Sequence, residues 1–293
     1  MDMQTEGVEG TVVTFAGGTL QEAALVVFTA EVAGEWLVVT DRSPFHPVSL
    51  SWPDQPGDRG WLTCGTTRFS VLDSREGLLN RRTGVLCVGE DARALKRSDP
   101  DLTSVVLHVT EAAPTTKSVR LEVDATFRAA LSVQHTGVHL AALALNRAAS
   151  GFWSKDPQDP DSLGAPNLDM AAVTRSEIST QASIDHYRFG KSLRKKGFDT
   201  VGFLADLPAR AADVNAVLRG FLATPAPIGI SPAAGPLADR RLWSTCLNGA
   251  DVAMPCGGTH LADLADLAEV MVFMDATEDG FVMRTTSWRA PIG

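Results

Sequence analysis

The sequence predicts an α+β protein in which an N-terminal small β-barrel precedes an α+β domain. Three observations support this: short apolar segments separated by turn residues before residue 110, helical periodicity after it, and a closing hairpin pattern. With 293 residues and 44% hydrophobic content, the chain is long enough for two packed cores. We expect residues 1–115 to form the barrel domain and residues 116–293 the second, α+β domain.

The barrel is predicted from five short apolar runs bounded by Gly, Pro and Asp. These runs occupy residues 24–28, 36–40, 67–72, 84–88 and 104–109. His108 lies inside the last run, where we expect a structural histidine that forms hydrogen bonds within the core. Residues 111–116 include Pro114 and small residues, so this segment is the expected joint between the domains.

The second domain is expected to combine helices with a strand pair. Residues 155–166 are rich in Asp and Pro and predict an exposed loop. Residues 211–222 carry apolar side chains at helical spacing and predict an amphipathic helix. Apolar runs at 270–273 and 281–286 flank the turn sequence Glu278-Asp279-Gly280, which predicts a hairpin.

Two pairs of metal-ligand residue types are the most informative feature of the chain. In the first pair, His135 and His139 recur with Leu131 and Leu143 every four residues, so a helix would place them on one face directed into the protein. Two core histidines that bond to the backbone are the alternative for this pair alone.

The second pair is Cys256 and His260, separated by Gly257, Gly258 and Thr259. The two glycines favour a turn, and for Cys256 alone a buried, inert thiol is the alternative. Together the two pairs supply the nitrogen and sulfur donors that Zn²⁺ prefers. We therefore predict a zinc centre held by His135, His139, Cys256 and His260.

The charge pattern limits the possible contacts with nucleic acid. A net charge of -9 argues against a general nucleic-acid-binding surface. A local basic cluster could still contact RNA, with Tyr187 and Phe189 interleaved as stacking groups. The alternative is an ordinary solvated helix face. The cluster consists of Arg188, Lys191, Arg194, Lys195 and Lys196.

The cellular location of the protein is predicted from its first residues, its apolar segments and its cysteines. The first ten residues are polar and acidic, and no segment approaches the roughly 20 apolar residues of a membrane span. Four cysteines without a dense framework suit a reducing compartment. We expect a cytoplasmic protein.

Three motifs resemble the alanyl-tRNA editing (AlaX-like) family, which is related to the editing domain of alanyl-tRNA synthetase. The segment from His135 to Leu140 is similar to the HxxxH helix of that family, and the segment from Pro255 to His260 matches its PCGGTH turn. Residues 41–47 together with 55–60 resemble its upstream loop. The resemblance extends from about Trp36 to His260, with an unmatched stretch in between. It implies that residues 116–293 form a zinc-binding catalytic editing domain.

Two departures from the family pattern affect the expected substrate. Residues 48–54 replace a glycine run that approaches the substrate in the family. Val138 stands where relatives carry a hydroxyl residue that helps to select the amino acid. His46 is expected to be a loop side chain and not a ligand.

The resemblance implies a trans-editing hydrolase that deacylates mischarged tRNA, with seryl- or glycyl-tRNA(Ala) as the expected substrate. The two ligand pairs would then form the catalytic zinc site, and the basic cluster would hold the acceptor end of the tRNA. The alternatives are a zinc hydrolase of a small amino-acid ester or amide, or a non-catalytic zinc-stapled tRNA-binding module. Apart from the basic cluster, the expected substrate-binding residues are Thr136, Val138, Gln55, Gly258 and Thr259.

Overall fold

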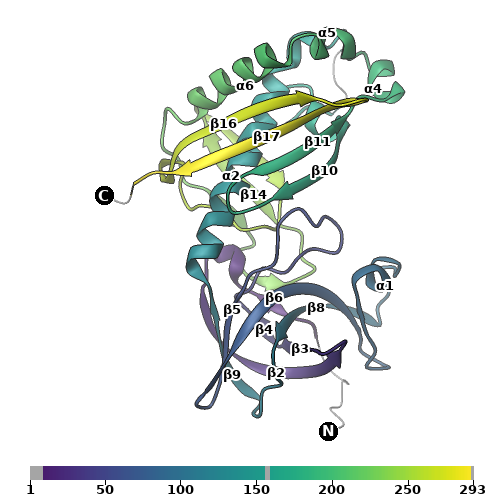
Figure 1. Cartoon of the computed structure of the whole chain (residues 1–293), viewed down its shortest axis with the longest axis vertical. Helices are drawn as coiled ribbons and strands as arrows, with labels where there is room; N and C mark the ends of the chain where they lie inside the picture. Colours follow the sequence, from purple (N-terminus) through teal and green to yellow (C-terminus); the bar gives the residue numbers. More distant parts are fainter. Residues whose placement is uncertain (1–8, 156–158, 292–293) are drawn as a thin grey trace. The chain divides into compact units, whose positions relative to one another are not determined.

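The computed structural model describes residues 9–155 and 159–291, and its contacts divide the chain into two compact units (Figure 1). The first unit combines Met1–Arg128, Ile230–Arg241 and Cys256–Thr259. The second combines Ala129–Gly229, Leu242–Pro255 and His260–Gly293. Each unit therefore brings together stretches that are far apart in the sequence.

The first unit is built on a seven-stranded antiparallel sheet in the order β5-β9-β2-β3-β8-β6-β7. Strand β5 pairs with both β9 and β6. All five predicted runs overlap strands of this sheet, whereas β5 and β9 were not predicted. The strands are β2 (Gln21–Val32), β3 (Glu35–Thr40), β5 (Gly60–Cys64), β6 (Thr67–Asn80), β7 (Leu86–Val88), β8 (Leu102–Thr110) and β9 (Ser118–Val123).

The alternating side chains of these strands bury an apolar cluster that includes Phe45, Leu62 and Leu121. Within this unit a buried ion pair joins Arg128 to Asp58, with 2.8 Å between Nε and Oδ1. Smaller elements complete the unit: β1 (Val12–Val13), η1 (Phe15–Gly17), β4 (Arg42–Ser43), α1 (Gly89–Arg93) and β13 (Gly235–Pro236).

The second unit is built on a four-stranded antiparallel sheet in the order β10-β11-β17-β16. Its hairpin of β16 and β17 confirms the predicted strand pair around Gly280. The prediction of a mixed α+β protein is thereby confirmed. The strands are β10 (Val173–Ile178), β11 (Ser183–Arg188), β16 (Leu267–Ala276) and β17 (Gly280–Arg289).

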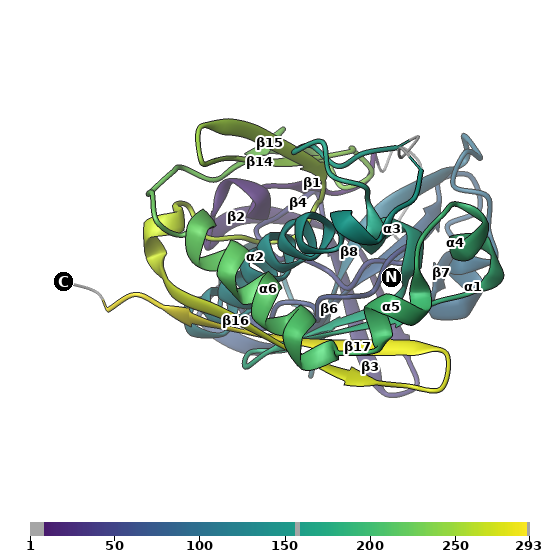
Figure 2. The same ribbon diagram turned by 90° about the horizontal axis from the view of Figure 1, so that it is seen from above.

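Helices α2 (Ala125–Ala148) and α6 (Leu207–Phe221) lie on the same side of the β16–β17 hairpin (Figure 2). The Gln134 side chain of α2 donates to the Ser287 carbonyl and accepts from the Ser287 N–H. The Asn215 side chain of α6 forms the same two-way bond with the Val272 backbone. Both helices are thus fixed in register with the sheet.

Local capping explains where both helices begin. The Asp124 carboxylate accepts hydrogen bonds from the N–H groups of Thr126 and Phe127 and so starts α2. The Asp206 carboxylate accepts from the Ala209 N–H, so α6 begins earlier than the 211–222 helix predicted from its apolar spacing.

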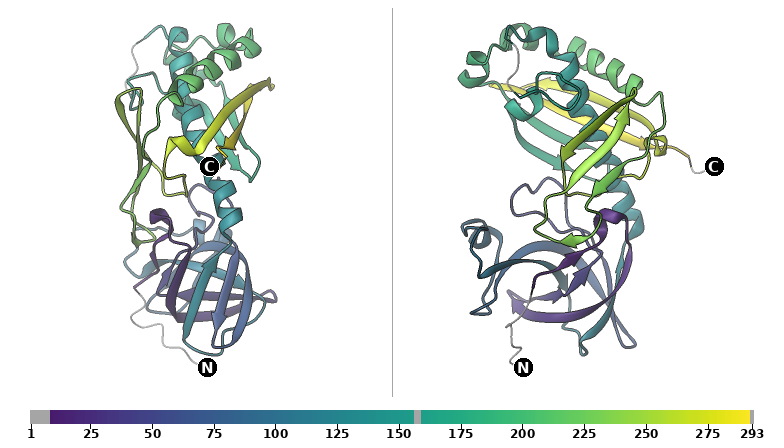
Figure 3. Two further views of the ribbon diagram at one scale, coloured as in Figure 1. Left: turned by 90° about the vertical axis from the view of Figure 1, so that its left-hand side faces the viewer. Right: turned by 180° about the vertical axis from the view of Figure 1, so that it is seen from behind.

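The second unit also carries short elements around the main sheet and a hairpin of β14 and β15 (Figure 3). Among the residues that the structure describes, no helix combines the length and apolar character needed to cross a membrane. The remaining elements are η2 (Ser150–Phe152), α3 (Leu168–Ala172), α4 (Lys191–Lys195), α5 (Thr200–Leu204), β12 (Gly229–Ser231), β14 (Leu242–Leu247), β15 (Ala250–Pro255) and η3 (Leu264–Asp266).

Candidate metal centre

Helix α2 presents His135 and His139 on one side, as their spacing predicted. The two rings stack with centroids 4.9 Å apart, and the flanking Leu131 and Leu143 are buried. The indole of Trp243 lies against the other face of His139, with ring centroids 5.1 Å apart. Both imidazoles are therefore held in place by packing, with His135 buried and His139 half-buried.

His260 follows β15 and completes a cluster of three imidazoles within the second unit. Its ring centroid lies 4.2 Å from that of His135 and 4.8 Å from that of His139. The Thr136 hydroxyl accepts a hydrogen bond from the Leu261 N–H at 3.1 Å and lies 3.4 Å from His260 Nδ1. Thr136 thus links the backbone next to His260 to helix α2. The next turn of this helix carries His139.

The turn that carries Cys256 is held by hydrogen bonds within the first unit. The Gly258 N–H donates to the Cys256 sulfur at 3.4 Å. The Gln55 amide donates to the Thr259 hydroxyl at 2.9 Å and accepts from the Thr259 N–H at 3.3 Å. Three of the predicted substrate-binding residues, Gln55, Gly258 and Thr259, therefore belong to one buried arrangement.

The four predicted ligands form a group whose donor atoms all lie within 4.8 Å of one another. Cys256 belongs to a stretch that groups with the first unit, but peptide bonds join this stretch to Pro255 and His260 of the second. Zinc bonds of about 2.0–2.3 Å imply separations of roughly 3.3–3.8 Å between the donors of a tetrahedral site. Small side-chain adjustments would bring these donors to that geometry, so the residues fit a metal such as Zn²⁺.

The protonation states of two candidate ligands, His139 and Cys256, bear on metal binding in opposite directions. Burial lowers the pKa of His139 to about 4, so this ring is neutral at physiological pH. Burial raises the pKa of Cys256 to about 12, with a smaller contribution from the charge of Asp54 and an opposing one from the Gly258 N–H. A bound cation would compensate for the cost of forming the thiolate in this environment.

Asp54 is a feature of the site that sequence reasoning missed. Burial raises the pKa of this carboxyl group to about 6, against the hydrogen bonds donated by the Gln55 N–H and by Trp52. It lies at the end of the segment 48–54 that replaces the family's glycine run. The signal available in the sequence was the position of Asp54 directly before Gln55. A carboxyl group next to a buried amide side chain would share that buried environment.

Among the remaining predicted site residues, Val138 is half-buried on α2, and all five members of the basic cluster are exposed. Arg188 ends β11 and forms an ion pair with Asp279 at 2.9 Å. Lys191, Arg194 and Lys195 lie on α4, and Lys196 follows it.

The interpretation of Tyr187 and Phe189 as base-stacking groups is wrong, because both side chains are buried. The rings of Tyr187 and Phe281 stack with centroids 4.6 Å apart, and Phe189 packs against Phe198 and Phe203. Alternation along β11 directs Tyr187 inward while Arg188 points outward. These aromatic residues contribute to the core of the second unit.

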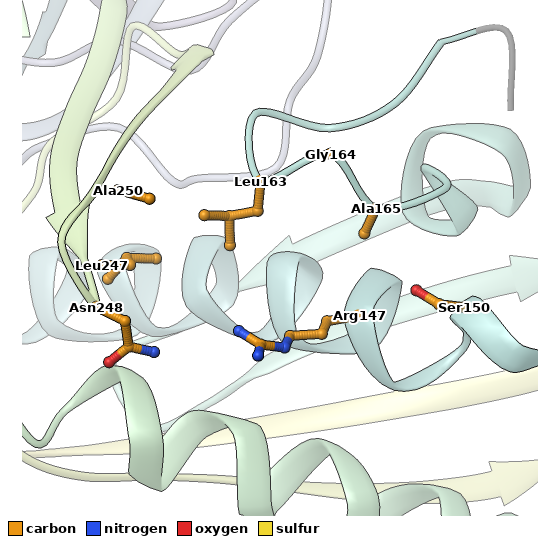
Figure 4. A pocket seen from close by; sticks show the side chains of 8 residues that line it. All are labelled: Arg147, Ser150, Leu163, Gly164, Ala165, Leu247, Asn248 and Ala250. Carbon is orange, nitrogen blue, oxygen red and sulfur yellow. The ribbon is translucent and has the colours of Figure 1, made fainter.

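A separate cavity of about 510 Å³ lies in the second unit near the carboxyl end of α2 (Figure 4). Its lining, as far as the described residues define it, contains none of the predicted site residues. The lining residues are Arg147, Ser150, Leu163, Gly164, Ala165, Leu247, Asn248 and Ala250.

Comparison with known proteins relates the chain to an alanyl-tRNA synthetase. No family model matches the sequence. An alanine–tRNA ligase of Cereibacter sphaeroides is 23% identical over 286 residues, which cover 96% of this chain. The aligned region spans only 28% of the length of that ligase. The similarity therefore extends along nearly all of this chain but concerns a part of the relative.

Proposed function

We propose that this protein is a zinc-dependent hydrolase that removes a wrongly attached amino acid from tRNA. The observation that carries this proposal is the convergence of the donor atoms of His135, His139, Cys256 and His260 within 4.8 Å. The similarity to an alanine–tRNA ligase supports tRNA as the substrate class. Seryl- and glycyl-tRNA(Ala) are the proposed substrates, and the cytoplasm, where translation takes place, is the proposed location.

The chemistry expected of the centre follows from its donors. A bound Zn²⁺ would supply Lewis acidity toward the ester that joins the amino acid to the tRNA. The imidazoles would hold the ion as neutral ligands, and Cys256 would hold it as a thiolate. The carboxyl group of Asp54, with its pKa of about 6, could keep or release a proton close to neutral pH.

The proposed amino-acid pocket uses polar groups beside the ligands. Thr136 lies one residue after His135, and Thr259 lies one residue before His260. The Thr259 hydroxyl already accepts a hydrogen bond from Gln55. We assign Gln55 and Gly258 to shaping this pocket, because a buried glycine leaves room close to the backbone.

The main test is deacylation of tRNAs that carry serine, glycine, threonine or the correct alanine. The zinc-loaded protein should release serine or glycine rapidly and spare alanine, and His139→Ala should release none. If the protein binds zinc stoichiometrically but releases no amino acid from any of these tRNAs, the proposal fails. A small-ester hydrolase or a non-catalytic zinc module would then be the better description.

The exposed basic cluster is the proposed contact for the tRNA acceptor end. Four of its five cations lie on or next to α4 and point into solvent, where they can neutralise phosphates. Reversing Lys195 and Lys196 to Glu should weaken tRNA binding by roughly 10-fold and reduce its salt dependence. The matched control is a second double reversal, Arg219→Glu with Arg240→Glu, which changes the net charge equally at two exposed positions outside the cluster. Equal loss in both variants would mean that only net charge matters.

A further inference from the structure

The side of α2 that carries His135 extends three turns to Asn146, because 11 residues return almost to the same helical direction. The Asn146 side-chain amide oxygen accepts a hydrogen bond from the Asp169 N–H at 2.9 Å. The Asp169 carboxylate in turn accepts from the Tyr187 hydroxyl at 2.7 Å. This side of α2 is thereby connected, through α3, to strand β11.

Asp185 lies on β11 two residues before Tyr187, so both side chains lie on the same face of the sheet. Tyr187 and Asp185 are only 2% and 3% exposed. The charge of Asp185 is among the causes that raise the pKa of Tyr187, after burial and Asp169, which agrees with their proximity. Asp185 is therefore directed inward, toward the helix side that Tyr187 faces.

A second anchor, near the middle of α2, fixes where His135 lies along this face. Gln134, the residue before it, is bonded to the Ser287 backbone of β17. Strand β17 pairs with β11, with Met283 opposite Asp185 and Thr285 opposite Ser183. Asp185 thus lies on the strand face between the Gln134 and Asn146 anchors of the helix.

A buried carboxylate such as that of Asp185 loses its hydration, and this loss destabilises the fold unless other groups compensate for it. Burying a charged carboxylate is unfavourable unless it accepts hydrogen bonds or lies near a cation. A metal-bound histidine presents one ring nitrogen to the ion, and its second N–H commonly donates to a carboxylate that fixes the ring orientation. His135 is itself 3% exposed, so its second nitrogen also needs a partner from within the protein.

We propose that the Asp185 carboxylate accepts a hydrogen bond from the His135 ring nitrogen that is turned away from the metal, and so positions this ligand. The role of Asp185 toward the ion rests on the metal centre of the proposed function. Asp185 would be a positioning residue, because it acts on the ion through His135. The same bond would also increase the electron-donating strength of the imidazole toward the bound ion.

The first test is zinc affinity, measured by competition with a chromophoric chelator in the absence of tRNA. Asp185→Ala should weaken binding by about 10- to 100-fold. Asp185→Asn, which keeps an acceptor oxygen, should recover part of that loss. Ser183→Ala removes another buried polar group from the same strand face and should leave the affinity unchanged. Unaltered affinity in Asp185→Ala would overturn the inference while leaving the metal centre intact.

The second test does not depend on metal. Nitrogen-15 NMR of the histidine rings in the metal-free protein, with His135 assigned by its Gln variant, reports which ring nitrogen carries the proton. Asp185→Ala should change the tautomer or the ring N–H shift of His135 and leave the resonances of His108 unchanged. An unaltered His135 spectrum would contradict the proposed bond, even if the wild-type protein binds no zinc and the proposed function fails.

Discussion

Two histidines, one in each unit, have the same depressed pKa but different surroundings. Burial lowers the pKa of both His108 and His139 to about 4. The ring nitrogens of His108 lie 2.9 Å from the Ser43 hydroxyl and 2.9 Å from the Val38 carbonyl. The prediction of a structural histidine is thereby confirmed for His108. His139 instead stacks on His135 and Trp243 and meets His260 edge to face.

The comparison shows that a shifted pKa alone does not identify a functional histidine. Desolvation acts on both rings in the same way, so both are neutral at physiological pH. The surroundings of their nitrogens differ: a hydroxyl and a carbonyl complete the bonding of His108, whereas three other potential donor residues converge on His139. Convergent donors that are all electron-rich favour a cation among them.

The largest expected effect that separates the two histidines is on metal affinity. His139→Ala should weaken zinc binding by roughly 1,000-fold. This loss is larger than the about 10- to 100-fold that is typical when a residue that only hydrogen-bonds to a metal ligand is removed. His108→Gln should leave the zinc affinity within about 2-fold, because His108 is not among the converging donors. Chelator competition on both variants checks this. Equal losses would mean that the two histidines affect zinc only through the stability of the fold.

The next effect concerns acid stability and should appear at His108. Its folded pKa of about 4 lies below the ordinary value of 6.5, so between these pH values the unfolded chain binds a proton that the folded protein does not. The contribution of neutral His108 to the free energy of unfolding is fully present above pH 6.5. It falls by about 3 kcal/mol as the pH approaches 4.

Urea unfolding in chelator at several pH values measures this dependence. His108→Gln should be less stable at pH 7 but should lose less stability on acidification than the wild-type protein. Since His46 has a similarly lowered pKa and is present in both proteins, the difference between them isolates His108. Parallel pH profiles would show that His108 does not remain neutral in the folded protein.

A somewhat smaller effect is stabilisation by metal. Free zinc at 100 times its dissociation constant should stabilise the folded protein by about 2.7 kcal/mol, which thermal unfolding would record as a higher midpoint. The same addition should shift His108→Gln as much as wild type and should barely shift His139→Ala. A shift retained in the His139 variant would place the stabilising zinc at some other group of residues.

The smallest expected effect concerns substrate choice beside the ligands. Val138→Thr adds a hydroxyl next to His139, which should favour seryl-tRNA over glycyl-tRNA by about 10-fold in relative deacylation rate. Val138→Ile controls for side-chain size. An unchanged ratio of rates would remove Val138 from the residues that select the amino acid.

The local parts of the candidate site were predictable from sequence because their signals are short-range. The four-residue spacing placed His135 and His139 on one helix side, and Gly257 and Gly258 indicated the turn before His260. Such signals depend on backbone periodicity and turn chemistry, which neighbouring residues determine. The α+β class and the closing hairpin followed from similar patterns.

The missed features depend on contacts between distant segments. Strand β9 was overlooked although Ser118–Val123 alternates in burial, because its partners β2 and β5 lie far away in the sequence. The sequence around Tyr187 was interpreted by its cluster of cations, and the period of two that buries Tyr187 and Asp185 was not considered. The direction of that strand face follows from pairing with β17 and from the hydrogen bond between Tyr187 and Asp169.

The most direct test of the central claim is single-turnover release of serine from seryl-tRNA(Ala) by one preparation in three states: chelated, reloaded with zinc, and untreated. The proposed function predicts that chelation abolishes release and that stoichiometric zinc restores it to the level of the untreated protein. His108→Gln should follow the same pattern, and His139→Ala should remain inactive after zinc is added. Equal release by chelated and reloaded protein, with metal absence verified, would contradict a catalytic metal centre at His135, His139, Cys256 and His260.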